Sequence, residues 1–431
     1  MVFKVTFYYA IAAIAAFSTL SLPVYVAANQ SGCISSYDAK TDYFPDKVQV
    51  KYNPGFEISY KNNAKYVSNK ISGETYVLYQ CGSSIPDDAK ATPADSLQVG
   101  GWTKLMAVPG TKVALDSAPA SAIIEMLGLQ DSVAGAYKFF TVTSACMQKR
   151  LAELPRVEQT YGTPNARRRR SNDRLGNSLV RRVSYDLAKD DLQWTFTTYG
   201  MSDPKSVAVN PENAADMLGK AEWIKFVAAF FNKEAEANKL FSQIENNYNS
   251  IKKTAPKTEK TVGIARYNKV ANGTIVSWTI DQPQQWLVQG ISDAGMKAHS
   301  GDTATFSDVN DFYKAVSAWD VLIDTSIEPL PHGGATIPQW ENISNGYKFG
   351  SSKSAQSLPF VKANAIYRSD LISSYQNATD YNEHLQIQSD NLLGDLVKIA
   401  KTASGADDTK WYRNLPNKVS VDWISSSDCK N

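Results

Sequence analysis

The sequence has few of the residues from which common active sites are built. Its 431 residues include three histidines, His299, His332 and His384, and four cysteines. It contains no G-x-S-x-G nucleophile motif, no H-E-x-x-H zinc motif, no P-loop and no G-x-G-x-x-G dinucleotide motif. A Ser-His-Asp hydrolase needs a histidine beside a nucleophile, and no histidine lies near such a motif. The sequence therefore predicts no catalytic residue, no metal site and no cofactor.

The net charge of the chain is also small. The chain has 45 basic and 43 acidic side chains, a formal charge of +2. This balance creates no broad field for nucleic acid or for an anionic membrane surface. Apolar residues make up 43% of the chain, which is typical of a folded protein and sufficient for two ordinary cores. We expect a monomer with two domains that does not bind nucleic acid.

Residues 1–28 have the pattern of a signal peptide. Lys4 supplies a positive charge, residues 7–22 are apolar, Pro23 follows, and Val26-Ala27-Ala28 offers small residues for cleavage. The alternative is a signal anchor, but the apolar run is shorter than the ~20 residues that a membrane span needs. The pattern predicts a secreted protein, extracellular or periplasmic.

Secretion makes the four cysteines candidates for two disulfides, because the compartment is oxidising. Three pairings are possible, and the absence of a C-x-x-C spacing argues against zinc. We expect Cys33 to pair with Cys81, because both flank a predicted hairpin, and Cys146 to pair with Cys429. The same compartment permits N-glycosylation. The predicted glycosylation sites are Asn272, Asn342 and Asn377.

The fold class predicted from the pattern along the chain is α/β. Residues 29–107 read as an N-terminal extension with a β-hairpin, formed by "FEISY" and "TYVLYQC". Residues 108–213 read as a first α/β lobe. In it, "VAL" is a strand, apolar residues spaced three and four apart predict a helix closed by Gly128, and "DSVAGAY" is a second strand. This βαβ unit predicts a parallel sheet.

An arginine-rich insertion near 156–182 interrupts the first lobe. It includes four consecutive arginines, Arg167 to Arg170. Three interpretations remain open: a solvated loop, a cleavage site at Arg170 for a protease of the secretory pathway that recognises basic residues, and an anion-binding rim.

The rest of the chain reads as a connector, a second lobe and a tail. Residues 214–255 have apolar positions three and four apart on both sides of Asn232, which predicts two helices or one long bent helix. Residues 256–400 contain strand and helix patterns of a second α/β lobe, and residues 401–431 form a C-terminal tail. The predicted architecture is two α/β lobes joined by a long helical connector.

Several segments resemble the Fe-siderophore/cobalamin class of periplasmic solute-binding proteins. "KVALDSAPASAIIEMLGLQDSVAGAY" is similar to the first βαβ unit of that family, and "AAFFNKEAEANKLFSQIENNY" to its linker helix. "TVGIARYNKVANGTIVSWTIDQPQQWLVQGISDAGM", "DVLIDTS" and "AIYRSDL" are similar to strands and helices of its second lobe. The resemblance covers residues 108–400. The arginine-rich insertion, the hairpin and the cysteine-containing tail depart from the bacterial pattern and suggest a divergent secreted member, with a eukaryotic source left open.

The resemblance implies a non-enzymatic binding protein. It would capture an iron chelate or siderophore, a corrinoid or a haem-like ligand in a cleft between the lobes for uptake. Its partner would be a membrane transporter of the ABC type or a receptor. Two alternatives stay open: a secreted hydrolase with a dispersed active site, and an interaction protein that kept the fold without a ligand.

The candidate ligand-binding residues lie where predicted strands end, because open α/β sheets bind ligands at the carboxyl ends of their strands. A Ser/Pro turn there exposes backbone N–H groups at a helix N-terminus, although Asp116 or Ser117 could equally serve as the helix cap. The aromatic candidates could instead be core residues, and the arginine could pair with Asp370. The predicted ligand-binding residues are Asp116, Ser117, Ala118, Pro119, Tyr137, Tyr199, Trp278, Trp286 and Arg368.

Overall fold

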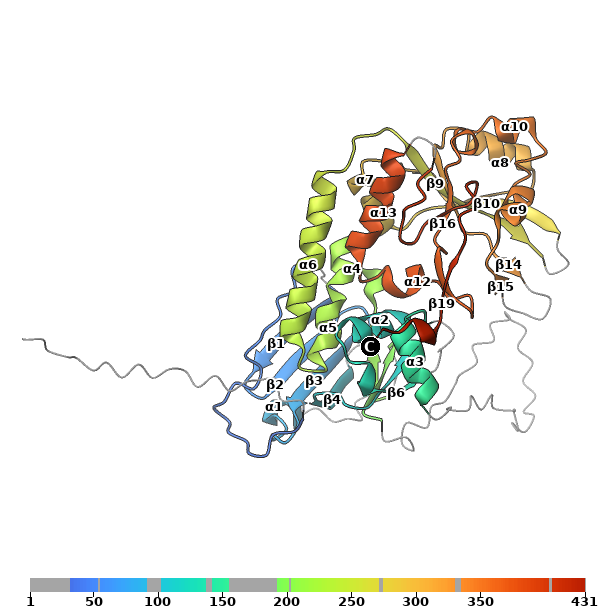
Figure 1. Ribbon diagram of the computed structural model, residues 1–431. Coiled ribbons are helices and arrows are strands. Elements are labelled where there is room, and N and C mark those ends of the chain that lie inside the picture. The colour runs from blue at the N-terminus through green and yellow to red at the C-terminus, as the bar shows by residue number, and fades with distance from the viewer. Residues whose placement is uncertain are drawn as a thin grey trace, which may run out of the picture.

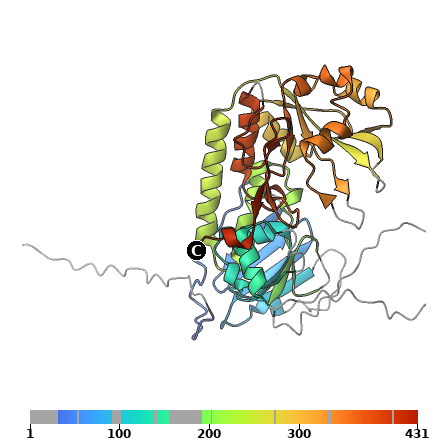
Figure 2. The same ribbon diagram turned by 45° about the vertical axis from the view of Figure 1, so that its right-hand side comes forward.

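The computed structural model describes residues 32–52, 55–90, 102–136, 142–154, 192–200, 203–270, 274–329, 335–402 and 405–430. Two α/β lobes are joined along one side by the long helix α6 (Glu234–Lys253), against which α13 (Ser389–Lys401) packs (Figure 1). Figure 2 shows the same two bodies from another side, again with α6 running from one to the other. The predicted α/β class is confirmed. The predicted signal peptide, the arginine-rich insertion, Tyr137 and Asn272 lie outside the described residues.

The N-terminal extension is a sheet and not a simple hairpin. Its strand order is β1-β2-β3-β4, antiparallel except for the parallel pair β3–β4. The segment between the two predicted hairpin strands is itself a strand, β2, which lies inside the sheet. The prediction failed there because buried polar side chains, Lys65 and Asn69, interrupt the apolar alternation. The strands are β1 (Phe56–Lys61), β2 (Ala64–Asn69), β3 (Glu74–Gln80) and β4 (Trp102–Val108).

The first lobe contains the predicted βαβ unit. Its strands run parallel in the order β6-β5-β7-β8. The connecting helix α2 (Ala118–Met126) follows β5, its Ser117 cap accepts a bond from Ala120 N at 3.4 Å, and Gly128 ends the turn with φ 69°. The remaining elements are β5 (Val113–Asp116), β6 (Val133–Ala136), α3 (Ala145–Glu153), β7 (Trp194–Thr197) and β8 (Ser206–Ala208).

The connector region is three helices, α4 (Met217–Ala221), α5 (Trp223–Ala229) and α6. Of the two alternatives left open by the sequence, separate helices are found, because Asn232 between α5 and α6 takes the left-handed conformation, with φ 56°. Helix α5 is buried over its whole length and packs Trp223 and Phe226 against Phe56 of the N-terminal sheet. The extension and the first lobe therefore share one core, and α6 carries the chain from this core to the second lobe.

The second lobe is built on a mixed sheet of order β12-β10-β9-β13-β16-β18, with β9, β13 and β16 parallel. Residues 401–431 are not a separate tail. Their strand β18 (Arg413–Asn414) completes this sheet, and β19 (Asp422–Ile424) pairs with β17 (Ile372–Ser374). The other strands are β9 (Thr261–Lys269), β10 (Ile275–Asp281), β11 (Lys297–Ala298), β12 (Ala304–Phe306), β13 (Val321–Asp324), β14 (Glu328–Pro329), β15 (Ala335–Thr336) and β16 (Ile366–Arg368).

The helices cover this sheet and fill the space between the lobes. Among the described helices, none is long and apolar enough to span a lipid bilayer. Buried apolar side chains form one cluster that runs through both lobes. The helices not yet given are α1 (Asp87–Lys90), α7 (Gln285–Asp293), α8 (Val309–Ala315), α9 (Trp340–Gly346), α10 (Lys353–Gln356), α11 (Pro359–Lys362) and α12 (Asp380–His384).

Both predicted disulfides are confirmed. Cys33 pairs with Cys81, which ties the start of the described chain to the end of β3. Cys146, on α3 of the first lobe, pairs with Cys429. Cys429 follows β19, the strand that pairs with β17. The second bridge therefore connects the two lobes covalently at a point far from α6 in the sequence.

Candidate functional site between the lobes

The predicted Ser/Pro turn lies where β5 ends and α2 begins. Ser117 is buried and caps α2, so the capping role left open by the sequence is present. Ala118 and Pro119 are half-buried in the first helical turn, and the Asp116 carbonyl accepts a bond from Thr198 Oγ1 at 3.4 Å. The turn is thus at the carboxyl edge of the first sheet, as predicted, but most of its polar groups serve the fold.

Arg368 ends β16 at the carboxyl edge of the second sheet. Its guanidinium donates to Asp324, to Asp370 Oδ2 at 2.7 Å and to the Ser326 carbonyl at 2.9 Å. Burial alone would lower the pKa of Arg368, but the two carboxylates raise it above its ordinary value. Arg413, from β18, donates to both oxygens of Asp370, at 2.8 and 3.1 Å. The charge of Arg368 is therefore neutralised within a buried network. This is the pairing with Asp370 that the sequence left open as an alternative, and Asp324 is a second partner.

Arg266 is a more accessible cation at this edge. It follows Ala265, the residue of β9 that pairs with Asp324 at the end of β13. Its guanidinium contacts Asp281 of β10, and its side chain is 36% exposed, against 13% for Arg368. Asp281 also accepts a bond from Thr325 Oγ1 at 3.4 Å. Sequence reasoning missed Arg266 because it lies within the strand β9. Only the register between β9 and β13 shows that Arg266 lies level with the carboxyl end of β13.

Helix α12 of the second lobe packs against α2 and the start of α3 of the first lobe. Glu383 Oε2 accepts bonds from Thr143 N and Thr143 Oγ1, each at 2.5 Å, and from Ser144 N at 3.2 Å. These donors lie at the N-terminus of α3, where a carboxylate is favoured. Burial nevertheless raises the pKa of Glu383. This contact holds the lobes together through polar groups that water cannot reach.

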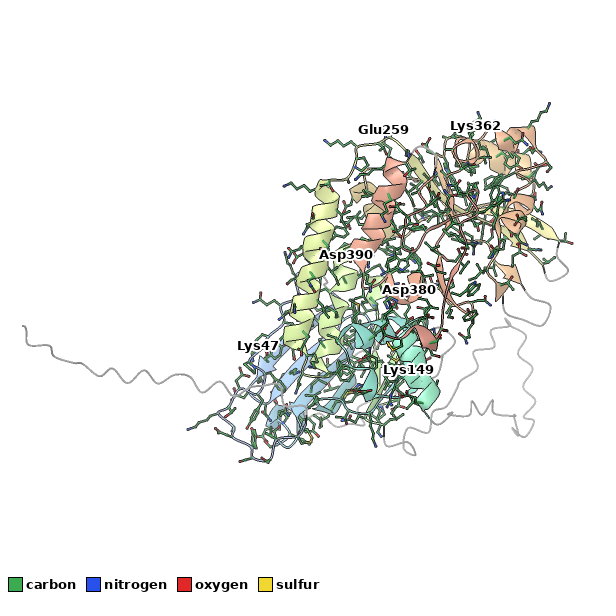
Figure 3. The ribbon with its side chains drawn as sticks, viewed as in Figure 1. Lys47, Lys149, Glu259, Lys362, Asp380 and Asp390 are labelled. Atoms are coloured by element: carbon green, nitrogen blue, oxygen red, sulfur yellow. A yellow bond between two sulfur atoms is a disulfide. The ribbon has the colours of Figure 1, made fainter. Side chains whose placement is uncertain are left out.

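A histidine completes the same contact. His384 Nδ1 lies 2.8 Å from Asp380 Oδ1, and His384 Nε2 lies 3.6 Å from Glu125 Oε2 of α2. Burial alone would lower the pKa of His384, but these two carboxylates raise it to about 10. Burial would likewise raise the pKa of Asp380, whereas His384 lowers it to about 2. Figure 3 shows Asp380 between the two lobes.

Asp380, Glu383 and His384 also have one potential metal-ligand atom each within 4.8 Å of one another. Protein donors occupy one carboxylate oxygen of Asp380 and one of Glu383, whereas Glu383 Oε1 has no hydrogen-bond partner within the described part of the chain. Asp380 Oδ2 accepts from Trp411 Nε1 at 2.7 Å, and Glu383 Oε2 accepts three bonds. A protonated His384 cannot ligate a metal. The arrangement is suited to an ion-paired lock between the lobes.

The aromatic candidates do not converge on one surface. Trp278 is buried in β10 and donates to the Gly346 carbonyl at 3.0 Å. Trp286 is buried on α7, where Lys220 Nζ of α4 lies 4.6 Å from its ring centroid. Both are packed as core residues, which is the alternative that the sequence analysis left open for the aromatic candidates. Tyr199 follows β7 and is 76% exposed, so its ring is open to a ligand. A ligand contact by any of these residues remains a prediction.

A separate hollow lies away from the contact between the lobes. It has a volume of about 650 Å³ over the N-terminal sheet, and Tyr60, Lys61 and Asp88 are among its lining residues. Lys61 pairs with Asp88 at 2.5 Å, so the charge in this hollow is compensated locally.

No family model and no curated protein matches this sequence. Solved structures with low similarity to this chain are found. The periplasmic haem-binding protein HutB of Vibrio cholerae has 11% identity and a TM-score of 0.44, over 68% of this chain and 99% of that one. The petrobactin-binding protein YclQ from Bacillus subtilis has 13% identity and a TM-score of 0.43, over 68% of this chain and 92% of that one. An ABC transporter substrate-binding protein from Listeria monocytogenes has 15% identity and a TM-score of 0.42, over 67% of this chain and 98% of that one.

The chain resembles periplasmic solute-binding proteins. These proteins are of the class that the sequence segments resemble.

Proposed function

We propose that this protein is a secreted, non-enzymatic binding protein that captures a small anionic ligand, such as an iron chelate, between its lobes. The position of Arg266 carries the proposal. It lies at the carboxyl edge of the second sheet, where open α/β sheets bind ligands, and it keeps a third of its side chain accessible. A guanidinium there can exchange its contact with Asp281 for two parallel bonds to a ligand carboxylate.

The first lobe supplies a complementary side chain. Tyr199 leaves the carboxyl end of β7 with its ring in solvent, and a flat chelate or macrocycle can pack on such a ring. The secretory pattern of residues 1–28 supports an extracellular or periplasmic location. A membrane transporter or receptor would then accept the loaded protein.

Thermal unfolding with defined probes tests the proposal. We would use ferric citrate, a ferric hydroxamate chelate, haemin and cobalamin, each over a range of concentrations. A true ligand stabilises by about 2.7 kcal/mol when its concentration reaches 100 times its Kd, so the Tm should rise with concentration.

The variant Arg266→Ala should weaken binding of the responding probe about tenfold or more, because a hydrogen bond to a charged group contributes about 1.5–3 kcal/mol. The matched control is Lys297→Ala. Lys297 pairs with Glu259 at the amino end of β9, and Figure 3 shows Glu259 at the end of the molecule away from the first lobe. Equal binding by the Arg266 variant and wild type would contradict the proposed site.

A second candidate function is that of an interaction protein without a small ligand. Two observations favour it: the buried Glu383 contact and the Cys146–Cys429 bridge both hold the lobes together. In that case none of the four probes shifts the Tm, and Arg266→Ala and Lys297→Ala behave alike.

A further inference from the structure

Two stacked aromatic rings lie open to solvent at the edge of the second lobe. Tyr375 follows β17, Trp423 belongs to the neighbouring strand β19, and their ring centroids are 5.4 Å apart with an interplanar angle of 14°. Tyr375 is 67% exposed and Trp423 is 40% exposed. Large aromatic side chains are usually buried, so a stacked, exposed pair indicates a flat apolar face that another group covers.

A glycosylation sequon lies in the same turn. Asn377-Ala378-Thr379 begins two residues after Tyr375. The turn is closed by two bonds of 2.8 Å, from Asn377 N to the Ser374 carbonyl and from Ser374 N to the Ala378 carbonyl. Asn377 is exposed and has φ 63°, a left-handed conformation that asparagine tolerates. The turn therefore presents Asn377 at the surface close to the aromatic face in sequence.

The other described sequon has a different setting. Asn342 lies in the first turn of α9, and its Oδ1 accepts a bond from Gln339 N at 3.1 Å as part of a capping box. A glycan on Asn342 would have to be attached to a side chain that already stabilises a helix start. In the Asn377 sequon the threonine serves as a helix cap, because Thr379 Oγ1 accepts a bond from Asn382 N at 3.3 Å at the start of α12.

We propose that Asn377 carries an N-linked glycan whose first sugar packs over the rings of Tyr375 and Trp423. One face of an N-acetylglucosamine ring presents C–H groups, and this face matches a flat aromatic surface in size and polarity. In the transfer, the side-chain nitrogen of Asn377 bonds to the anomeric carbon of that sugar. The bond from this carbon to the diphosphate of a lipid-linked donor breaks, and one amide proton is released. The secretory pathway supplies the donor, so the proposal rests on the predicted secretion.

The test uses the full chain secreted by a eukaryotic host that attaches high-mannose glycans. Asn29, which begins a fourth sequon, Asn29-Gln30-Ser31, is replaced by glutamine together with Asn272 and Asn342, so that Asn377 is the remaining sequon. Glycopeptide mass spectrometry should find Asn377 occupied. Endoglycosidase H then leaves one sugar, and peptide N-glycosidase leaves none and converts Asn377 to aspartate. The one-sugar form should keep the Tm of the untreated protein, whereas the sugar-free form should melt about 1–3 °C lower.

The aromatic face is tested by Tyr375→Ser and Trp423→Ser in the same background. Each should reduce the Tm difference between the one-sugar and sugar-free forms to near zero. Ile71→Ser, at another exposed apolar side chain, should leave that difference intact. If a serine variant is not secreted, hydrogen exchange of residues 372–379 in the two glycoforms decides, with slower exchange expected when the sugar is present. An unmodified Asn377 would overturn the site, and equal Tm and exchange in the two glycoforms would overturn the packing.

Discussion

At the scale of single residues, His384 links protonation to the contact between the lobes. It lies on α12 and faces three carboxylates, Asp380 and Glu383 of its own helix and Glu125 of α2. Its charged form is stabilised because two of these carboxylates contact its ring nitrogens. The sequence could not assign this role, since His384 and Glu125 are far apart in the chain and no motif joins them.

We predict that His384 makes the protein less stable as the pH rises. Its folded pKa of about 10 lies above the ordinary value of about 6.5, so its stabilisation is complete below pH 6.5 and is lost toward pH 10. The gap in unfolding free energy between wild type and His384→Gln should shrink by about 1–3 kcal/mol from pH 6.5 to pH 9. Denaturant titrations at the two pH values measure this gap.

Wild type and His384→Gln must be compared at each pH because another buried group, Lys220, changes the stability of both proteins with pH in the opposite direction. Burial lowers the pKa of Lys220 to about 7, so Lys220 adds stability as the pH rises above that value. This contribution is the same in wild type and in the variant and cancels in the gap. A gap of equal size at both pH values would show that His384 is not charged in the folded protein.

At the scale of elements, the parts with regular apolar patterns were predictable from sequence and the parts with buried charge were not. The βαβ unit from Val113 to Ala136 has the predicted strands, helix and Gly128 end because its apolar residues keep their spacing. Strand β2 was missed because Lys65 occupies a fully buried position. The Ser/Pro turn lies at the end of β5, as the sequence predicted, whereas the position of Arg266 needed the register between β9 and β13, and a ligand contact by either stays a prediction.

Lys65 is buried because it joins the N-terminal sheet to the connector helices. Its Nζ contacts Glu234 Oε1 at 2.5 Å, the Ala229 carbonyl at 2.6 Å and Asn232 Oδ1 at 2.8 Å. Burial lowers the pKa of Lys65 and raises that of Glu234, so each depends on the other to stay charged. The pair fixes the place where α5 ends and α6 begins.

We predict that Lys65→Met lowers the unfolding free energy by about 3–5 kcal/mol, because Glu234 is left buried without its cation. The double variant Lys65→Met/Glu234→Leu should recover part of this loss, since the unpaired charge is gone while the carbonyl of Ala229 still lacks its donor. Lys314→Met is the control, because the Lys314–Asp311 pair is exposed, and it should change stability by less than about 0.5 kcal/mol. Urea unfolding of these proteins, together with Glu234→Leu alone, checks the prediction, and additive losses in the double variant would argue against a coupled pair.

At the scale of the whole molecule, three connections limit how the lobes move. Helix α6 crosses between them with α13 packed along it, and a helix cannot bend sharply without losing backbone bonds. The α12 contact and the Cys146–Cys429 bridge hold the opposite side. The sequence predicted the connector and the pairing of the cysteines. It could not show that the bridge joins two lobes, because that depends on the path of residues 401–431 through the second sheet.

We therefore predict that the bridge and the α12 contact each suffice to keep the lobes together. Cys146→Ser/Cys429→Ser should lower the unfolding free energy by about 2–4 kcal/mol yet leave the radius of gyration unchanged, because Glu383 still binds the start of α3. Glu383→Ala alone should also leave the radius unchanged, because the bridge remains. Only the triple variant should expand, as the lobes turn about the end of α6. Small-angle X-ray scattering of the four proteins distinguishes the outcomes. Expansion on losing the bridge alone would show that the α12 contact is too weak to hold the lobes, and no expansion in the triple variant would show that α6 and α13 hold them without help.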